Sequence, residues 1–446
     1  MTTSIFLDFT LPNAPTWFYL SAILAIALFF KFRRALSIRN WDLLMLFALV
    51  PGFLLLLQES QRAAAAGISP SPRALWWGYL WLLGGSLYFF LRCLMDLVLV
   101  RRPVLDPNIT RGGMTWLMAA IFVCLGGVAV RNTPSNEPPI GRGSAVLEAA
   151  QERAAEIVTQ TAGEPIDGRG TRFWVTRSLA AGCHLAVVVA LILIGLWHFQ
   201  DLNAGMSAAM LYLLLPYIAF HVTQVHHIWP TALMTLSVLA YRRPIVSGVL
   251  LGAATGTSFF PALTLPVWLS FYQGRARGRF VIALVGAAAC CLALTVWFLW
   301  LNGQLAANLR HTLGLSEWQP WRGASQSTSF WSEIHWAYRI PVFVFYLTFV
   351  AITAVWPRPK DLAHLIALSA AALIGVQFWY ADNGGVYVLW YLPLLLLLVF
   401  RPNLSDRHSP PAEQFADDIV ARSGRWLRRG SSGIAGRLRR PTPARS

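Results

Sequence analysis

Long apolar blocks are the feature that most restricts what this chain can fold into. A bilayer core takes about 20 residues of helix to cross, and blocks of that order recur along the sequence. Backbone groups in lipid must bond within the protein, so each block is expected to be helical. No alternating barrel pattern is present. The blocks lie at about 16–30, 41–57, 75–100, 113–130, 176–197, 206–221, 228–240, 245–272, 280–301, 338–356, 361–379 and 385–400.

Composition supports a membrane protein and excludes several soluble classes. Of the 446 residues, 56% are hydrophobic and only 13% are charged, which is far too apolar for a soluble protein of this length. The net charge is +16, but the arginines cluster at block ends and in the tail, where they orient helices in a membrane. Membrane lipid is therefore the expected partner, and nucleic acid is not.

Other motif classes are missing from the sequence. The five cysteines all fall in apolar blocks, so they are interpreted as core residues and no metal site is predicted. No phosphate-binding glycine loop, zinc-protease motif or nucleophile elbow is present. The sequence therefore predicts no cofactor and excludes an ATP-driven transporter built on this chain alone.

Block 245–272 is expected to be two short helices rather than one crossing. Arg242 and Arg243 precede it, and three more arginines follow it by position 279. Cytoplasmic loops collect Lys and Arg, so both ends should lie on the same side. A break near Thr257–Pro261 satisfies this, because Gly256 and proline interrupt a helix.

The resulting prediction is an all-α polytopic protein of about 12–13 transmembrane helices. It is placed in a bacterial inner membrane, with the N-terminus outside and the C-terminus cytoplasmic. Residues 1–112 form N-terminal helices, 113–401 a transmembrane core with outer loops 131–175 and 302–336, and 402–446 a basic, disordered cytoplasmic tail. The segments expected inside are 31–40, 101–112, 198–205, 241–244, 273–279, 357–361 and the tail from 401.

Polar groups gather in several places expected on the outer side. Loop 131–175 contains an amphipathic helix flanked by acids. Loop 302–336 mixes tryptophans with arginines, which suits either membrane anchoring or the binding of sugar and phosphate. The motif HVTQVHH at 221–227 has three interpretations: packing between helices, hydrogen bonding to a bound head group, or a metal site. The metal interpretation is the weakest, because adjacent histidines point to different helix faces. Elsewhere, Asp96 is expected to pair with Arg92 or Arg101.

The segment 206–273 resembles the multi-spanning GT-C glycosyltransferases, especially the bacterial polyprenyl-phosphate-mannose-dependent mannosyltransferases. In that family a Gly-Gln-x-Asn-like turn precedes a helix and then a Gly-rich stretch that ends in a basic residue and proline. The resemblance covers roughly 175–275, and the remainder only by helix layout. The residues that carry it are TQVHH at the turn, Ser247–Gly248 and Gly252 in the Gly-rich stretch, and Phe259, Phe260 and Pro261 at its end.

The resemblance implies transfer of a mannose-like sugar, with inversion, from a polyprenyl-phosphate donor to a glycan or lipid acceptor at the outer face. An acid in an early outer loop would be the general base: Glu137 first, then Asp167 and Glu164. Substrate-binding candidates are Gln224, His226, His227, Ser258, Arg310 and Arg322. Ser258 stands where the family has a basic residue, so Arg310 or Arg322 would supply the phosphate contact.

Two other functions stay open at this point. One is a non-catalytic membrane scaffold with a degenerate site, which should show no connected polar cluster. The other is a secondary transporter or lipid flippase, which would use the broken segment 245–272 at mid-membrane.

Overall fold

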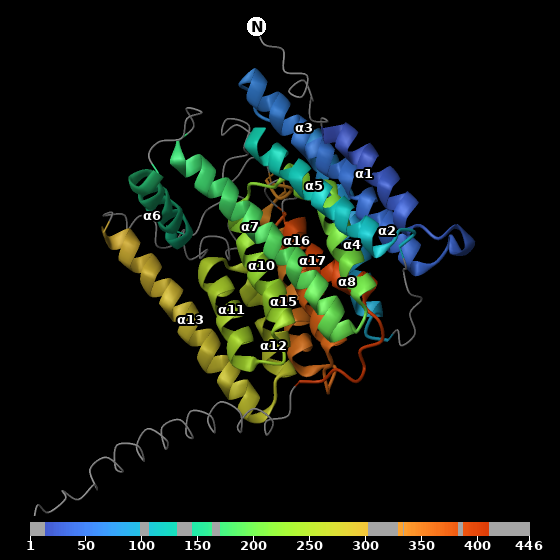
Figure 1. Ribbon diagram of the computed structural model, residues 1–446, viewed down its shortest axis with the longest axis vertical. Coiled ribbons are helices and arrows are strands. Elements are labelled where there is room, and N and C mark those ends of the chain that lie inside the picture. Colours follow the sequence, from blue (N-terminus) through green and yellow to red (C-terminus); the bar gives the residue numbers. More distant parts are fainter. Residues whose placement is uncertain are drawn as a thin grey trace, which may run out of the picture.

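The chain folds into a bundle of helices. The computed structural model describes residues 14–98, 107–131, 145–162, 170–301, 329–332, 334–381 and 387–409. Across these ranges there is no strand, only an isolated bridge between Asp361 and His408. The predicted all-helical class is confirmed, and Figure 1 shows the helices packed side by side with α16 and α17 near the centre. Both central helices are almost wholly buried.

Among the residues that the structure describes, seven helices are long and apolar enough to cross a bilayer, which fits a multi-pass membrane protein but is fewer than the 12–13 transmembrane helices predicted. Two of them include a short segment of another helix type: a π-helix follows α7, and a 3-10 helix precedes α15. The crossing helices are α2 and α3 (Ile38–Ala48 and Val50–Ala66), α4 (Pro72–Met95), α5 (Arg111–Arg131), α7 with η3 (Thr171–Ile194 and Gly195–Phe199), α13 (Gly274–Leu301), η5 with α15 (Trp336–Tyr338 and Arg339–Val355) and α16 (Leu362–Trp379).

The remaining helices are shorter or less apolar. Most coincide with predicted blocks, and one, α6 (Ala145–Ala162), is the predicted amphipathic helix of the first long loop. It packs against α7 and α13, as Figure 1 shows. The others are α1 (Ala14–Phe29), η1 (Phe32–Arg34), α8 (Leu202–Leu214), α9 (Pro216–Phe220), α10 (Val225–Leu239), α11 (Pro244–Thr257), η4 (Phe260–Thr264), α12 (Leu265–Phe271) and α17 (Val388–Phe400).

The segments predicted to share one side of the membrane lie together. We call this region the basic end: residues 31–40, 107–111, 198–203, 239–244, 271–279, 356–361 and 401–409. Hydrogen bonds join these segments although they are far apart in sequence, which confirms that they lie together. Which side of the membrane the basic end faces stays a prediction. The bonds are Lys31 to Asn108 (2.7 Å), Arg111 to Asn203 (2.7 Å), His198 to the Leu239 carbonyl (2.7 Å), Arg39 to the Arg401 carbonyl (3.1 Å) and the Leu362 N–H to the Arg407 carbonyl (2.7 Å).

The predicted break in block 245–272 is also confirmed. Helix α11 ends at Thr257, Ser258 is extended (φ −153°, ψ 149°), and η4 and α12 then return to the basic end. The hydroxyl of Tyr272 donates to the backbone oxygen of Tyr241 at 2.6 Å, which joins the two ends of this hairpin. Both arginine clusters therefore lie on one side, as the charge pattern requires.

Glycines let the hairpin approach α13 closely. They recur every fourth residue of α11, so they line one face of the helix. A side chain at any of them would collide with α13, and two of the collisions would be with its backbone. The Gly-rich stretch that carries the family resemblance thus has a packing role. A Cβ at Gly248 would lie 2.5 Å from the Phe280 oxygen, at Gly252 2.3 Å from the Leu284 oxygen, and at Gly256 2.5 Å from the Cys291 Cβ.

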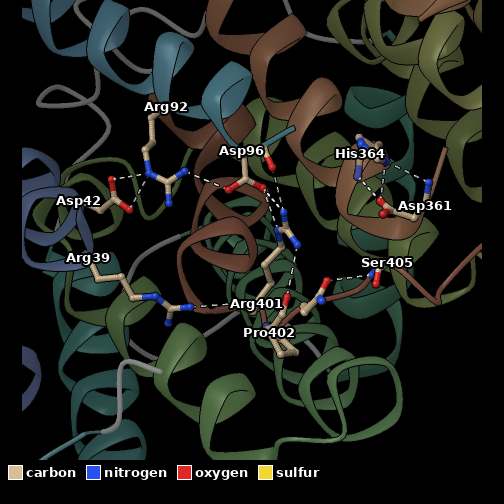
Figure 2. A network of polar contacts seen from close by, with 10 residues as sticks. Arg39, Asp42, Arg92, Asp96, Asp361, His364, Arg401, Pro402 and Ser405 are labelled. Atoms are coloured by element: carbon tan, nitrogen blue, oxygen red, sulfur yellow. Dashed lines mark hydrogen bonds and ion pairs between the residues drawn. The ribbon is translucent and has the colours of Figure 1, made fainter. Parts of the chain in front are cut away.

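Four buried charges form a network at the basic end (Figure 2). Arg92 donates to Asp42 at 3.1 Å and to Asp96 at 2.9 Å, and Arg401 donates through Nε to Asp96 at 2.8 Å. All four side chains are at most 5% exposed. The predicted pairing of Asp96 with Arg92 is confirmed, whereas Arg101 lies outside the described residues. Buried charges are tolerated only when paired, and this network ties α2 and α4 to the end of α17.

The close approach of α11 and α13 gives a first prediction. Gly252→Ala should destabilise the protein by about 1–3 kcal/mol, because its methyl group has no room beside the Leu284 carbonyl. Gly286→Ala is the control, since a Cβ there meets nothing within 4 Å. Thermal unfolding in detergent measures both. Equal unfolding temperatures would mean that the helices do not pack in this way.

The charge network gives a second prediction. Arg401→Gln should cost about 3 kcal/mol or more, because it removes a cationic partner of the buried Asp96 and leaves its charge less well compensated. Arg62→Gln removes an exposed partner of Glu59 and should cost less than about 1 kcal/mol. Denaturant unfolding of the two variants checks the difference. A loss for Arg401→Gln no larger than for Arg62→Gln would contradict the assigned role.

Candidate functional site

Several short helices end partway through the bundle. Helices α10, α11 and α17 have 15, 14 and 13 residues and each has one end at the basic end. At 1.5 Å per residue they reach about 20–23 Å, which is less than the roughly 30 Å of a hydrocarbon core. By this length argument their other ends lie within the hydrocarbon layer, and not at the outer surface where the turn 221–227 is expected from the sequence. We call the side chains gathered there the mid-membrane cluster: His221, Gln224, His226, His227, Ser258, Phe259, Phe260, Tyr380, Tyr387 and Trp390.

The turn before α10 is held against the middle of a crossing helix. His184 lies near the midpoint of the span Thr171–Phe199. Its Nδ1 is 2.9 Å from the Tyr212 hydroxyl, and its Nε2 is 3.3 Å from the backbone oxygen of Val222. A neutral imidazole satisfies both contacts by accepting at Nδ1 and donating at Nε2. The turn that carries the three histidines of HVTQVHH is thereby fixed at mid-depth.

Trp390 joins this turn to the broken hairpin. Its indole Nε1 donates to His227 Nδ1 at 2.9 Å. Phe260 stacks on the indole with ring centres 3.9 Å apart and planes 6° apart. Tyr387 stacks on it as well, at 4.0 Å. Because Nδ1 of His227 accepts this bond, the proton of its neutral ring sits on Nε2.

A second set of rings continues the cluster toward α16. Phe259 lies 5.6 Å from Tyr380 and 5.7 Å from Trp390, both edge-on. Tyr380 in turn stacks on Tyr387 at 5.5 Å. Phe259 and the neighbouring Ser258 are half-buried rather than enclosed. The arrangement presents aromatic faces and edges at the point where the hairpin turns back.

Two histidines of the cluster carry unsatisfied ring nitrogens. His221 is 5% exposed and packs edge-on against Phe53 with ring centres 5.0 Å apart. Neither of its nitrogens, nor Nδ1 of His226, has a hydrogen-bond partner among the described residues. A buried polar group without a partner costs free energy, so these atoms are suited to a polar ligand or to water.

Within the part of the chain that the structure describes, no three His, Cys, Asp or Glu side chains are placed to hold a metal ion. The cluster can instead donate and accept hydrogen bonds beside apolar ring faces. That combination suits a ligand with hydroxyl or phosphate groups and one apolar face, such as a sugar ring.

The structure brings four of the predicted substrate-binding residues into one region. His227 bonds to Trp390, which Phe259 next to Ser258 also contacts. Gln224 is the residue just before α10, and His226 follows in the first turn of that helix. The other predicted site residues lie outside the described residues, so their placement is untested. They are Glu137, Glu164, Asp167, Arg310 and Arg322.

Sequence reasoning missed the part of the cluster that comes from the last helices. The sequence predicts only apolar blocks for Tyr387 and Trp390 and a crossing helix for His184, and it gives no role to Tyr380. The available signal was the density of aromatic residues in YADNGGVYVLWY at 380–391, either side of a polar turn. Local spacing alone does not tell which distant turn such rings will face.

Comparisons with protein-family models, with curated proteins and with solved structures found no match. The resemblance to the GT-C glycosyltransferases therefore stays a prediction.

The bond between Trp390 and His227 can be tested directly. Trp390→Phe keeps a ring for stacking but removes the donor, which leaves the buried Nδ1 of His227 unpaired. The expected loss is about 1–3 kcal/mol of stability. Trp300→Phe is the control, because Trp300 is 61% exposed at the end of α13. Thermal unfolding in detergent measures both, and matching values would argue against the bond.

Proposed function

We propose that the protein is an integral membrane glycosyltransferase. It moves a mannose-like sugar from a polyprenyl-phosphate donor to a glycan or lipid acceptor at the outer face of a bacterial inner membrane. The single observation that carries the proposal is the set of unpartnered histidine nitrogens beside stacked aromatic rings, at the turn of a membrane hairpin. The resemblance of segment 206–273 supports it independently.

The orientation follows from charge. Arginine-rich loops stay in the cytoplasm, so the basic end would face the cytoplasm and the mid-membrane cluster would open toward the outer side. A lipid-linked donor reaches such a cluster from within the bilayer, whereas a water-soluble nucleotide sugar would have to cross part of the lipid. This geometry favours a lipid-linked donor.

The proposed roles follow from chemistry. Rings such as Phe259 and Tyr380 contact the apolar face of the sugar, and the nitrogens of His221 and His226 bond its hydroxyls or the phosphate. The acceptor hydroxyl oxygen attacks the anomeric carbon as the bond from that carbon to the phosphate oxygen breaks. Glu137 takes the hydroxyl proton as general base, with Asp167 and Glu164 as the other candidates. Polyprenyl phosphate leaves, and the anomeric configuration is inverted.

The test is sugar transfer from labelled polyprenyl-phosphate mannose or glucose by the purified full chain in liposomes. Glu137→Gln should lower the rate by about 100-fold or more, as expected for loss of a general base. Glu156→Gln is the matched control, because Glu156 lies on the same loop and its carboxylate pairs with Arg153 at the surface of α6. Its rate should equal that of wild type.

Two results would count against the proposal. Undiminished transfer by both Glu137→Gln and Asp167→Asn would remove the base assignment. An absence of transfer by wild type with every lipid-linked donor would overturn the glycosyltransferase proposal itself.

A secondary transporter or lipid flippase is the second candidate. It is favoured by one observation: a broken hairpin and a polar turn meet at mid-depth, as in transporters with discontinuous helices. Movement of a labelled lipid-linked sugar between leaflets, with no new glycosidic bond, would support this candidate over the first.

A further inference from the structure

Arginines gather at the base of the hairpin formed by α11, η4 and α12. The bond from the Tyr272 hydroxyl to the Tyr241 oxygen joins residues 31 positions apart, so the turn that enters the hairpin lies beside the turn that leaves it. Both turns are basic, and the fold therefore collects their positive charge in one place. The arginines concerned are Arg242, Arg243, Arg275, Arg277 and Arg279, of which all but Arg279 are exposed.

Arg407 approaches the same place from the segment that follows α17. Its backbone is fixed at the basic end, where its carbonyl accepts from the Leu362 N–H at 2.7 Å. The guanidinium groups of Arg407 and Arg242 both lie within electrostatic range of the ring of His198. Segments that are far apart in the sequence thus direct positive charge to one spot.

These arginines have no acidic partner. Within the described ranges of the chain, none of them forms an ion pair with a carboxylate. Nearby acids are engaged as helix caps instead: Asp201 accepts from the Ala204 N–H at 3.1 Å, and Asp361 accepts from the His364 N–H at 2.8 Å. The base of the hairpin therefore carries positive charge that the described residues do not balance.

Two of the arginines are held so that their terminal nitrogens stay free. Nε of Arg242 donates to the Tyr241 hydroxyl at 3.2 Å, and Nε of Arg277 donates to the Tyr272 backbone oxygen at 3.0 Å. A guanidinium held in this way still offers the N–H groups of both Nη atoms in a fixed fork. That fork matches two oxygens of a phosphate group.

A buried histidine within range of Arg242 lacks one hydrogen-bond partner. His198 is 4% exposed, and its Nε2 is 2.7 Å from the Leu239 carbonyl. Because a carbonyl only accepts, the proton of the neutral ring lies on Nε2, and Nδ1 is an acceptor. No donor among the described residues reaches that Nδ1. A hydroxyl of a bound head group, or a water that the head group orders, would supply one.

The depth of this place favours a lipid as the source of the phosphate. Trp197, next to His198, is 55% exposed, and tryptophan is typical of the interface between lipid and water. Apolar side chains exposed to lipid follow the arginines directly, since Ile245 on α11 and Ile282 on α13 are 48% and 75% exposed. A phosphate bound at the arginines would therefore have hydrocarbon beside it, as the phosphate of a phospholipid does.

We propose that the base of the hairpin binds the phosphate of an anionic phospholipid from the leaflet at the basic end. Arg242 and Arg407 contact the phosphate, and the other arginines of the two turns add to the attraction. A zwitterionic lipid fits less well, because its ammonium group would face the same unbalanced arginines. The inference needs no assumption about sugar transfer, since the site lies at the basic end and not at the mid-membrane cluster.

The experiment measures retention of phosphatidylglycerol by the purified full chain, using native mass spectrometry with phosphatidylcholine as the competing lipid. Wild type should retain phosphatidylglycerol in preference. Arg242→Gln/Arg407→Gln should lower the bound fraction about tenfold or more, since each arginine near an anionic surface contributes roughly a factor of five.

Arg33→Gln/Arg34→Gln is the matched control. It removes the same charge from two exposed arginines of η1, between α1 and α2. Figure 1 shows α1 and α2 across the bundle from α11 and α13. Retention by this control should equal that of wild type, and equal losses in the two double variants would overturn the site.

A variant that keeps the charge separates a shaped site from general attraction. Arg242→Lys/Arg407→Lys keeps both positive charges but loses the paired N–H groups of guanidinium. Its bound fraction should fall below that of wild type. Retention equal to wild type would overturn the site, because surface charge alone would then explain the binding.

A measurement on wild type does not depend on how the variants fold. Phosphatidylglycerol with a diazirine on its head group should crosslink to peptides containing 239–244, 271–279 or 401–409. Crosslinks confined to other peptides, those from 410–446 included, would overturn the proposal. Equal displacement of this probe by inorganic phosphate would overturn a lipid as the occupant, and equal displacement by phosphatidylcholine would overturn the selection for an anionic lipid.

Discussion

The close contact between α11 and α13 is the constraint on which the arrangement of the cluster depends. Three glycines on one face of α11 bring its backbone against that of α13, and the Tyr272–Tyr241 bond joins the ends of the hairpin. In lipid there is little hydrophobic force between helices, so close packing and hydrogen bonds hold them. With α11 fixed in this way, the chain must turn back at Ser258. That turn places Phe259 and Phe260 against Trp390.

The protein treats its buried polar groups in two different ways. At the basic end, Asp42, Arg92, Asp96 and Arg401 satisfy one another, so the network holds helices together. In the mid-membrane cluster, His221 and His226 keep ring nitrogens without partners among the residues described. Satisfied groups stabilise a fold, whereas unsatisfied ones cost free energy that a ligand can recover. This contrast is why we place the function at the cluster and a structural role at the network.

The family resemblance and the structure explain the same residues in different ways. Gly248 and Gly252 belong to the Gly-rich stretch that carries the resemblance, and the structure shows that they let α11 pack closely against α13. The turn TQVHH remains a candidate binding site, because packing does not account for the unpartnered Nδ1 of His226. The resemblance therefore now depends more on the turn and its aromatic neighbours than on the Gly-rich stretch.

The sequence by itself determined the helices, their approximate limits and the break at Thr257–Pro261, because these follow from local patterns of apolar residues, arginines and proline. It also indicated which loops share a side of the membrane, since that depends only on where charge is placed along the chain. Tertiary structure alone decided that Arg401 completes the Asp96 network, that Trp390 meets His227 and that Gly375 leaves room for the ring of Tyr346. These contacts join residues 29 to 305 positions apart, and no local spacing encodes which distant helix will lie alongside.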